Sequence, residues 1–250
     1  MTTVAVIPAR YASTRFPGKP LVNDTGKYLV QHVCERAAAA DSIDRVIVAT
    51  DDERIVEAVE SFGGEVVMTR TDQESGTDRV AEVALDLDCD LVVNVQGDEP
   101  EIEPEALDKL VSMFDNPECR MTTLACPFSA VAGGDPADPN SVKVVIDGSG
   151  RAMYFSRAQV PYPRDGCYAE GCHPLLHLGT YGYRRDFLLT VAGLSPTALE
   201  RTERLEQLRV LEHGYNIHVA VVDRAAVGID TPEDYAAFVK RHRSRASAMV

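Results

Sequence analysis

The sequence is poor in positive charge, and it contains no long apolar run. Only 25 residues are Lys or Arg against 39 Asp and Glu, which gives a net charge of −14. A surface this acidic repels nucleic-acid phosphates and anionic membranes, so we expect neither a nucleic-acid partner nor a membrane partner. A site for an anionic ligand must therefore be a local cluster of cations.

No apolar stretch approaches the roughly 18 to 20 residues that span a bilayer, and the N-terminal MTTVAVIPA has no secretory pattern. The six cysteines lie mostly in apolar or helical stretches, at positions 34, 89, 119, 126, 167 and 172. We therefore expect a cytoplasmic protein with reduced thiols. Cys167, Cys172 and His173 do not have the usual spacing of a zinc site.

The rest of the composition is that of an ordinary globular protein. With 45% hydrophobic and 26% charged residues over 250 positions, the chain can form one α/β domain or two small lobes. In the first half, β-branched runs alternate with helical patterns. The expected strands are Thr3 to Ile7, Arg45 to Ala49, Glu65 to Met68 and Leu91 to Val95. This alternation predicts a doubly wound, mostly parallel sheet, with its ligand at the carboxyl ends of the strands.

The second half of the chain predicts a smaller α+β lobe. A hairpin is expected from Ser141 to Phe155, because its Asp-Gly and Ser-Gly dipeptides supply the positive φ of a tight turn. One helix is expected from Leu199 to His213, and one strand from Ile217 to Val222. A final helix should begin at Thr231 and Pro232, an N-cap residue followed by proline at the first helical position.

The loop after the first strand gathers cations in this acidic chain. Arg10, Arg15 and Lys19 lie in PARYASTRFPGKP, residues 8–20, together with hydroxyls such as that of Ser13. Cations and backbone N–H groups together neutralise a polyphosphate. The glycine spacing matches neither the P-loop nor the dinucleotide fingerprint. The loop therefore predicts a polyphosphate site of another kind, and a solvated basic loop is the alternative.

Two carboxylates stand at the ends of apolar segments. Asp98 ends the run VVNVQGD, and Asp230 precedes the final helix. Mg²⁺ usually takes one or two carboxylates and fills its octahedron with phosphate oxygens and water. Alone, Asp98 fits a turn equally well and Asp230 fits helix capping better. Together they indicate a metal clamp for phosphoryl transfer.

Three further segments mix cations with amides and hydroxyls, namely residues 69–79, 177–184 and 205–209. Such groups suit a nucleobase, a carboxylate or sugar hydroxyls. Taken singly, these segments fit structural roles better. Ser75 can cap a helix, His177 can be a buried and satisfied side chain, and Glu206 can pair with Arg209 on an exposed helix face.

Assembled in order, these segments resemble the family of 3-deoxy-D-manno-octulosonate (Kdo) cytidylyltransferases. The matching stretches include IPARYASTRFPGKPL, VVNVQGDEP, HLGTYGYR, LEQLRVL and GIDTPEDY, and the matches extend from Val4 to Tyr235. The resemblance implies a fold of the nucleotide-diphospho-sugar transferase type. It also implies the reaction of CTP with Kdo to give CMP-Kdo and pyrophosphate, with Mg²⁺ as the cofactor.

The resemblance implies roles for individual residues. Lys19, Asp98 and Asp230 would be catalytic, and the two aspartates would hold Mg²⁺. The expected nucleotide-binding residues are Ala9, Arg10, Ser13, Arg15, Lys19, Arg70, Ser75 and Gln96. The expected sugar-binding residues are Arg157, His177, Tyr181, Glu206 and Gln207. Arg157 is the natural partner for the carboxylate of the sugar acid.

The expected layout has a nucleotide-binding core in residues 1–140 and a smaller lobe in residues 141–211 that binds the sugar and forms a homodimer. Residues 212–250 would return to the core. Two alternatives stay open. The acceptor could be a related 2-keto-3-deoxy sugar acid, such as 8-amino-Kdo, sialic acid or legionaminic acid. The chain could also be an inactive nucleotide-binding regulatory or scaffold homologue, although its retention of both metal carboxylates weighs against this.

Overall fold

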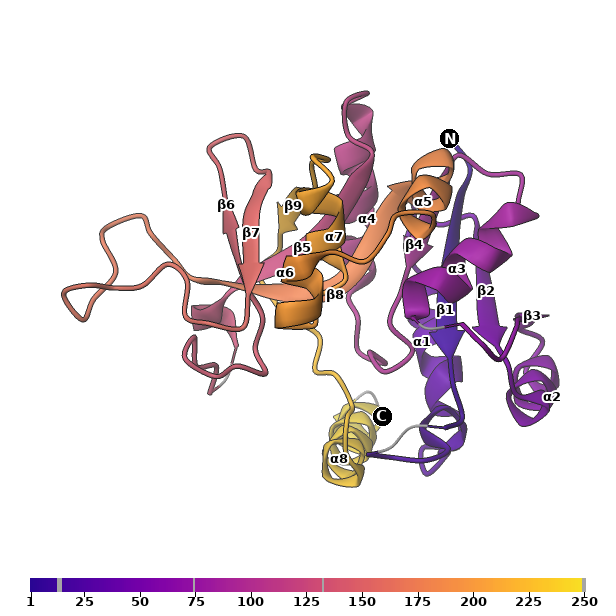
Figure 1. Cartoon of the computed structure of the whole chain (residues 1–250). Helices are drawn as coiled ribbons and strands as arrows, with labels where there is room; N and C mark the ends of the chain where they lie inside the picture. Colours follow the sequence, from indigo (N-terminus) through magenta and orange to yellow (C-terminus); the bar gives the residue numbers. More distant parts are fainter. Residues whose placement is uncertain (13–14, 74, 132, 249–250) are drawn as a thin grey trace. The chain divides into compact units, whose positions relative to one another are not determined.

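The computed structural model describes residues 1–12, 15–73, 75–131 and 133–248 (Figure 1). The chain divides into two compact units. Unit 1 comprises Met1–Leu107 and Ala226–Val250, and unit 2 comprises Asp108–Ala225. The chain therefore leaves unit 1 once and returns to it for its final helix. No helix in the described part of the chain is long and apolar enough to cross a membrane.

Unit 1 contains a parallel sheet with strand order β3-β2-β1-β4. Its strands are β1 (Thr3–Ala9), β2 (Arg45–Thr50), β3 (Glu65–Met68) and β4 (Leu91–Asn94). The runs of Val, Ile and Ala in β1, β2 and β4 are almost wholly buried, as expected for strands covered on both faces. The four strands expected in the first half of the sequence are therefore confirmed.

Helices alternate with these strands: α1 (Leu29–Ala38), α2 (Glu53–Ser61), α3 (Gly76–Leu85) and α4 (Pro104–Ser112), in which the chain passes into unit 2. Polar caps define where two of them begin. The Asp52 side chain accepts a hydrogen bond from the Arg54 N–H at the start of α2. Ser75 and Asp78 form a capping box at the start of α3. In Figure 1, α3 crosses in front of β1 and β2, which it contacts.

The final helix, α8 (Pro232–Ala248), completes unit 1. The Thr231 hydroxyl accepts a hydrogen bond from the Asp234 N–H at 3.2 Å, so the predicted start of this helix is confirmed. The apolar face of α8 packs in a buried cluster with α1 and the segment before α8, made of Leu29, Ile229, Tyr235, Phe238 and Val239. Phe16, from the cation-rich loop, packs against the same cluster.

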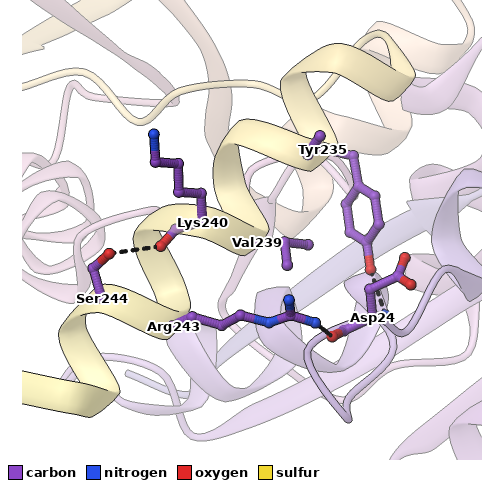
Figure 2. A pocket seen from close by; sticks show the side chains of 7 residues that line it. Asp24, Tyr235, Val239, Lys240, Arg243 and Ser244 are labelled. Atoms are coloured by element: carbon purple, nitrogen blue, oxygen red, sulfur yellow. Dashed lines mark hydrogen bonds between the residues drawn. The ribbon is translucent and has the colours of Figure 1, made fainter.

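A groove of about 500 Å³ runs along α8 beside the turn at Asp24 (Figure 2). The Asp24 N–H donates to the Tyr235 hydroxyl at 2.7 Å, and the Arg243 guanidinium donates to the Asp24 carbonyl at 2.9 Å. Lys240 and Ser244 complete its polar rim. None of the residues that line this groove is among those predicted to bind substrate.

Unit 2 is built on β5 (Met121–Pro127), with β8 (Leu175–Arg184) antiparallel on one side and β9 (His218–Val221) parallel on the other. The hairpin of β6 (Lys143–Ile146) and β7 (Ala152–Ser156) is also antiparallel and pairs with β8. Gly150 in its turn has a φ of 78°. The predicted hairpin is therefore confirmed. Strand β5 was not among the expected strands.

The prediction of a single helix from Leu199 to His213 is wrong. The structure has two short helices there, α6 (Ala198–Glu203) and α7 (Gln207–Glu212), preceded by α5 (Arg185–Ala192). Arg204 separates α6 from α7 with a left-handed φ of 56°. This conformation is unfavourable for a residue with a side chain, and the apolar spacing around it does not reveal the break. Short 3₁₀ turns lie at Lys19–Leu21, Met113–Asp115 and Phe128–Ala130.

A buried histidine joins α1 to α8. The His32 ring lies edge-on to the rings of Phe238 and His242, with centroid distances of 5.1 and 4.9 Å. Its Nε2 lies 2.7 Å from the Thr25 hydroxyl. Burial, followed by the proximity of His242, lowers the pKa of His32 to about 4. The folded protein therefore keeps this imidazole neutral in a pH range where the unfolded chain protonates it.

Acidification should weaken the fold through His32. The unfolded chain binds the extra proton as the pH falls below about 6.5, so the folded state loses about 2 kcal/mol of stability from this residue between pH 7 and pH 5. Urea unfolding at both pH values measures the loss. In the variant His32→Gln the loss should be smaller by that amount. Equal losses of unfolding free energy in the wild type and His32→Gln would show that His32 does not cause this pH dependence.

Candidate active site

Lys19 is the point at which three distant segments of unit 1 meet. Its Nζ donates to the Asp98 carboxylate at 2.8 Å and to the Ile229 carbonyl at 2.7 Å. The same nitrogen lies 3.9 Å from an oxygen of Asp230. Only 14% of the Lys19 side chain is exposed. The ammonium therefore links the loop after β1, the loop after β4 and the start of α8.

Arg15 extends this cluster toward solvent. Its guanidinium makes two contacts of 3.0 Å with the two carboxylate oxygens of Asp230. Both side chains are about half exposed or more, so the pair adds little to stability. Its partners can be exchanged when a charged ligand binds. Arg15, Lys19, Asp98 and Asp230 were all predicted site residues, and the structure brings them together.

The donor set of this cluster suits Mg²⁺. Asp98 and Asp230 supply hard carboxylate oxygens near one ammonium group, and Mg²⁺ needs only one or two protein carboxylates when phosphates complete its coordination. No group of three or more His, Cys, Asp or Glu suited to a metal occurs in the described residues. Two carboxylates would leave the other positions of a magnesium octahedron to phosphate oxygens and water.

Gly97 permits the close approach of the loop after β4 to the end of β1. A Cβ atom at this position would lie 2.8 Å from the Pro8 carbonyl oxygen. The carbonyl of the next residue, Asp98, accepts the Ile229 N–H at 2.9 Å. Backbone contacts thus fix Asp98 from two sides, which places its carboxylate at Lys19.

The first predicted nucleotide-binding residues join the end of β1 to the start of α3. Ala9 is buried as the last residue of β1. The Arg10 guanidinium donates to the carbonyls of Gln73 and Ser75 at 2.7 and 3.2 Å. The Ser75 hydroxyl accepts a hydrogen bond from the Asp78 N–H at 3.1 Å, so the predicted capping role of Ser75 is confirmed. Ser13 lies outside the described residues.

Two further predicted nucleotide-binding residues occupy neighbouring loops of unit 1. The Arg70 guanidinium makes two hydrogen bonds to the exposed Asp72 carboxylate, at 2.9 and 2.5 Å. This pairing lowers the pKa of Asp72 and raises that of Arg70. Gln96 follows β4 and is half-buried, one residue before Gly97. Both loops begin at carboxyl ends of the parallel strands, as the fold predicts.

In unit 2, β8 carries a pair of predicted sugar-binding residues. The rings of His177 and Tyr181 lie 5.5 Å apart, and His177 also meets Phe155 edge-on at 4.9 Å. The His177 Nε2 lies 2.9 Å from the Thr123 hydroxyl. Desolvation lowers the pKa of His177 to about 3, although part of its surface stays exposed. The imidazole is therefore neutral at physiological pH and can hydrogen-bond without carrying charge.

Arg157 is oriented by backbone carbonyls. Its guanidinium donates to the carbonyls of Glu203 and Pro139 at 2.7 and 3.0 Å, and its own N–H donates to the Glu203 carboxylate at 3.0 Å. The buried ammonium of Lys143 donates to the Arg157 carbonyl at 2.6 Å, and desolvation lowers the pKa of Lys143. Neither Lys143 nor Glu203 was predicted from the sequence. A lysine inside the apolar strand VKVVI was a usable signal for the first.

The break at Arg204 places the remaining two predicted residues at the start of α7. Glu206 is its exposed N-cap residue and contributes, after burial and Tyr183, to raising the pKa of Tyr181. Gln207 is 5% exposed, and its Nε2 has no hydrogen-bond partner among the described residues. A buried amide donor without a partner is costly, which favours a ligand at this position.

Comparisons with known proteins assign the family. A family model described as Cytidylyltransferase matches residues 4–217. A protein of Syntrophotalea carbinolica named 3-deoxy-manno-octulosonate cytidylyltransferase is 53% identical over 241 residues, 94% of this chain and 96% of the relative. A protein of Syntrophobacter fumaroxidans with the same name is 52% identical over 243 residues, 96% of each chain. The chain belongs to this cytidylyltransferase family.

Solved structures agree with this assignment. The structure of a CMP:2-keto-3-deoxy-manno-octonic acid synthetase complexed with CTP matches with a TM-score of 0.89 at 43% identity, over 99% of this chain and 100% of the other. A 4-diphosphocytidyl-2C-methyl-D-erythritol synthase of Anaerococcus prevotii, 15% identical with a TM-score of 0.59, covers 96% of this chain and shares the fold. The predicted α/β fold class and the family resemblance are confirmed, and the chain is a nucleotidyltransferase enzyme.

The close approach at Gly97 can be tested by Gly97→Ala. The added methyl group must push the Pro8 carbonyl away, so we expect the free energy of unfolding to fall by about 1 to 3 kcal/mol and the cytidylyltransferase activity to fall with it. Gly148→Ala is the control, because no described atom beyond Gly148 and its two chain neighbours lies within 4 Å of the Cβ position there. A Gly97→Ala protein that matches this control in stability and activity would contradict the role of Gly97.

Proposed function

We propose that this cytidylyltransferase converts CTP and Kdo into CMP-Kdo and pyrophosphate. The observation that carries the proposal is the meeting of Lys19, Asp98 and Asp230 in unit 1, in a chain whose relatives at about half identity bear the name of this activity. The anomeric hydroxyl of Kdo would attack the α-phosphorus in line while pyrophosphate leaves. Such a reaction needs positioning and charge neutralisation rather than a covalent enzyme intermediate.

The cation cluster of unit 1 would bind the triphosphate. Arg15 and Lys19 already lie against carboxylates, and an incoming polyphosphate competes for the same charge-assisted hydrogen bonds. Asp98 and Asp230 would hold Mg²⁺, which when bound neutralises charge on the phosphate oxygens. Arg10, whose guanidinium contacts carbonyls of the adjoining loop, would hold the triphosphate together with Ser13. Ala9, Arg70, Ser75 and Gln96 would surround the cytidine.

The polar groups of unit 2 would bind the sugar acid. Arg157 is held in place by carbonyls and offers its charge to a carboxylate. The Gln207 Nε2, which has no partner in the described part of the chain, the adjacent Glu206 and the neutral His177 suit sugar hydroxyls. Tyr181 completes this set beside His177. Lys143 and Glu203 would support Arg157 without touching the substrate.

The proposed enzyme is a cytoplasmic homodimer that pairs through the lobe of residues 141–211. Two exposed apolar side chains support a contact surface there. Met153 on β7 is 63% exposed, and Tyr162 in the following loop is 75% exposed. Large apolar groups on a protein surface favour association when they are contiguous with other apolar atoms. The six free thiols are consistent with a reducing compartment.

The function can be tested by pyrophosphate release with Mg²⁺ and CTP across Kdo, 8-amino-Kdo, sialic acid and legionaminic acid. We expect release that requires both Kdo and CTP, because the triphosphate cluster and the sugar-acid residues act on different substrates. ATP, GTP and UTP in place of CTP serve as controls for the nucleotide. Faster turnover of another acid would transfer the assignment to that acceptor. No release with any acid, while CTP still stabilises the protein against heat, would favour an inactive nucleotide-binding homologue.

A further inference from the structure

A cation–π contact joins α2 to the cation-rich loop of unit 1. The guanidinium carbon of Arg54, in the first turn of α2, lies 3.3 Å from the centroid of the Tyr11 ring. Tyr11 stands directly after β1 and Arg10. A cation this close to the face of an aromatic ring is attracted by the ring quadrupole. Neither residue was singled out by the sequence, because nothing in the local pattern predicts that they meet.

The Arg54 guanidinium is held in its plane by Asp52. Two of its N–H groups donate to the two oxygens of the Asp52 carboxylate, at 2.8 and 2.6 Å. The Asp52 carboxylate also caps α2 through the Arg54 backbone N–H at 3.0 Å. This pairing lowers the pKa of Asp52. The first turn of α2 therefore presents a fixed, flat cation to Tyr11.

Tyr11 passes this constraint to the residue before Lys19. The Gly18 N–H donates to the Tyr11 carbonyl at 2.9 Å, and the Tyr11 ring packs over Gly18, where a Cβ would lie 3.3 Å from two ring carbons. Gly18 has a φ of 72°, a conformation that glycine adopts readily and other residues do not. The chain then enters the 3₁₀ turn that begins at Lys19.

We propose that Tyr11 and Arg54 are positioning residues that hold the Lys19 end of the cation-rich loop in place for CTP. The proposal rests on the proposed function of that loop. Asp52 fixes Arg54, Arg54 fixes the Tyr11 ring, and the ring fixes Gly18 and the ammonium of Lys19 at Asp98. Neither residue needs to touch the substrate. The Arg54 side chain is 56% exposed, so its ion pair contributes little to global stability.

The test compares Arg54→Ala with Arg45→Ala in steady-state kinetics. Arg45 makes a similar exposed ion pair with Glu65, but it stands at the first residue of β2, away from the carboxyl ends of the strands. For Arg54→Ala we expect kcat/KM for CTP to fall about 5- to 30-fold, mostly through KM. The KM for Kdo should stay unchanged, and the melting temperature should stay within about 2 °C of the wild type. Arg45→Ala should match the wild type in kcat/KM for CTP, in the KM for Kdo and in melting temperature.

Conservative and paired variants separate positioning from a general structural role. Tyr11→Phe keeps the ring and should retain CTP kinetics, whereas Tyr11→Leu should lose as much as Arg54→Ala. In the double variant Tyr11→Leu/Arg54→Ala the two losses of kcat/KM for CTP should not add, because both changes break the same contact. Wild-type CTP kinetics in Arg54→Ala would overturn the proposal. The proposal would also be overturned if Arg54→Ala lowered the melting temperature and reduced kcat/KM equally for CTP and Kdo.

The outcome can be separated from a failure of the proposed function. If the wild-type protein makes no CMP-Kdo, the function fails, and calorimetric titration with CTP and Mg²⁺ still tests the contact. Weaker CTP binding in Arg54→Ala and Tyr11→Leu, with unchanged binding in Tyr11→Phe and Arg45→Ala, would support it. Equal CTP binding in all four variants would overturn it.

Discussion

The ion pair between Lys19 and Asp98 is the interaction on which the arrangement of unit 1 depends. It joins the loop after β1 to the loop after β4, and the Ile229 carbonyl brings the start of α8 to the same ammonium. A largely buried ammonium must be compensated by close partners, which here come from three segments far apart in the sequence. The same groups suit a triphosphate and Mg²⁺ once a ligand exchanges for one of these partners. The partners that compensate the charge of Lys19 thus also form the proposed binding site.

The acidic composition makes this local concentration of cations informative. In a chain with a net charge of −14, Arg10, Arg15 and Lys19 stand within one loop, and each has a defined partner in the structure. Unit 2 uses a different principle. Its Arg157 is oriented by carbonyls and supported by the buried Lys143, and desolvation keeps its His177 neutral. Unit 1 therefore has cations paired with partners that a ligand can replace, and unit 2 has fixed, partly buried polar groups, which suits the proposed division between triphosphate and sugar acid.

Much of unit 1 could be predicted from the sequence, because its buried parallel strands are continuous apolar runs and α2, α3 and α8 begin at polar caps. The rule that ligands bind at the carboxyl ends of such strands also predicted a site in the segments after β1 and β4, which carry Lys19 and Asp98. The break at Arg204 could not be predicted, since a left-handed arginine leaves no mark on the apolar spacing. The contacts of Arg54 with Tyr11 and of Glu203 with Arg157 were equally hidden. They are tertiary contacts between exposed or half-exposed residues, which periodicity does not encode.

The central claim is that the Lys19 cluster of unit 1 is the triphosphate site. Calorimetric titration of CTP with Mg²⁺ into wild-type protein and Lys19→Met tests it most directly, because this change removes the charge and keeps much of the side-chain volume. Lys27→Met is the matched control, since Lys27 pairs with Glu35 on the surface. The account predicts a loss of affinity of about tenfold or more for Lys19→Met and none for Lys27→Met. Equal CTP affinity in all three proteins would contradict it.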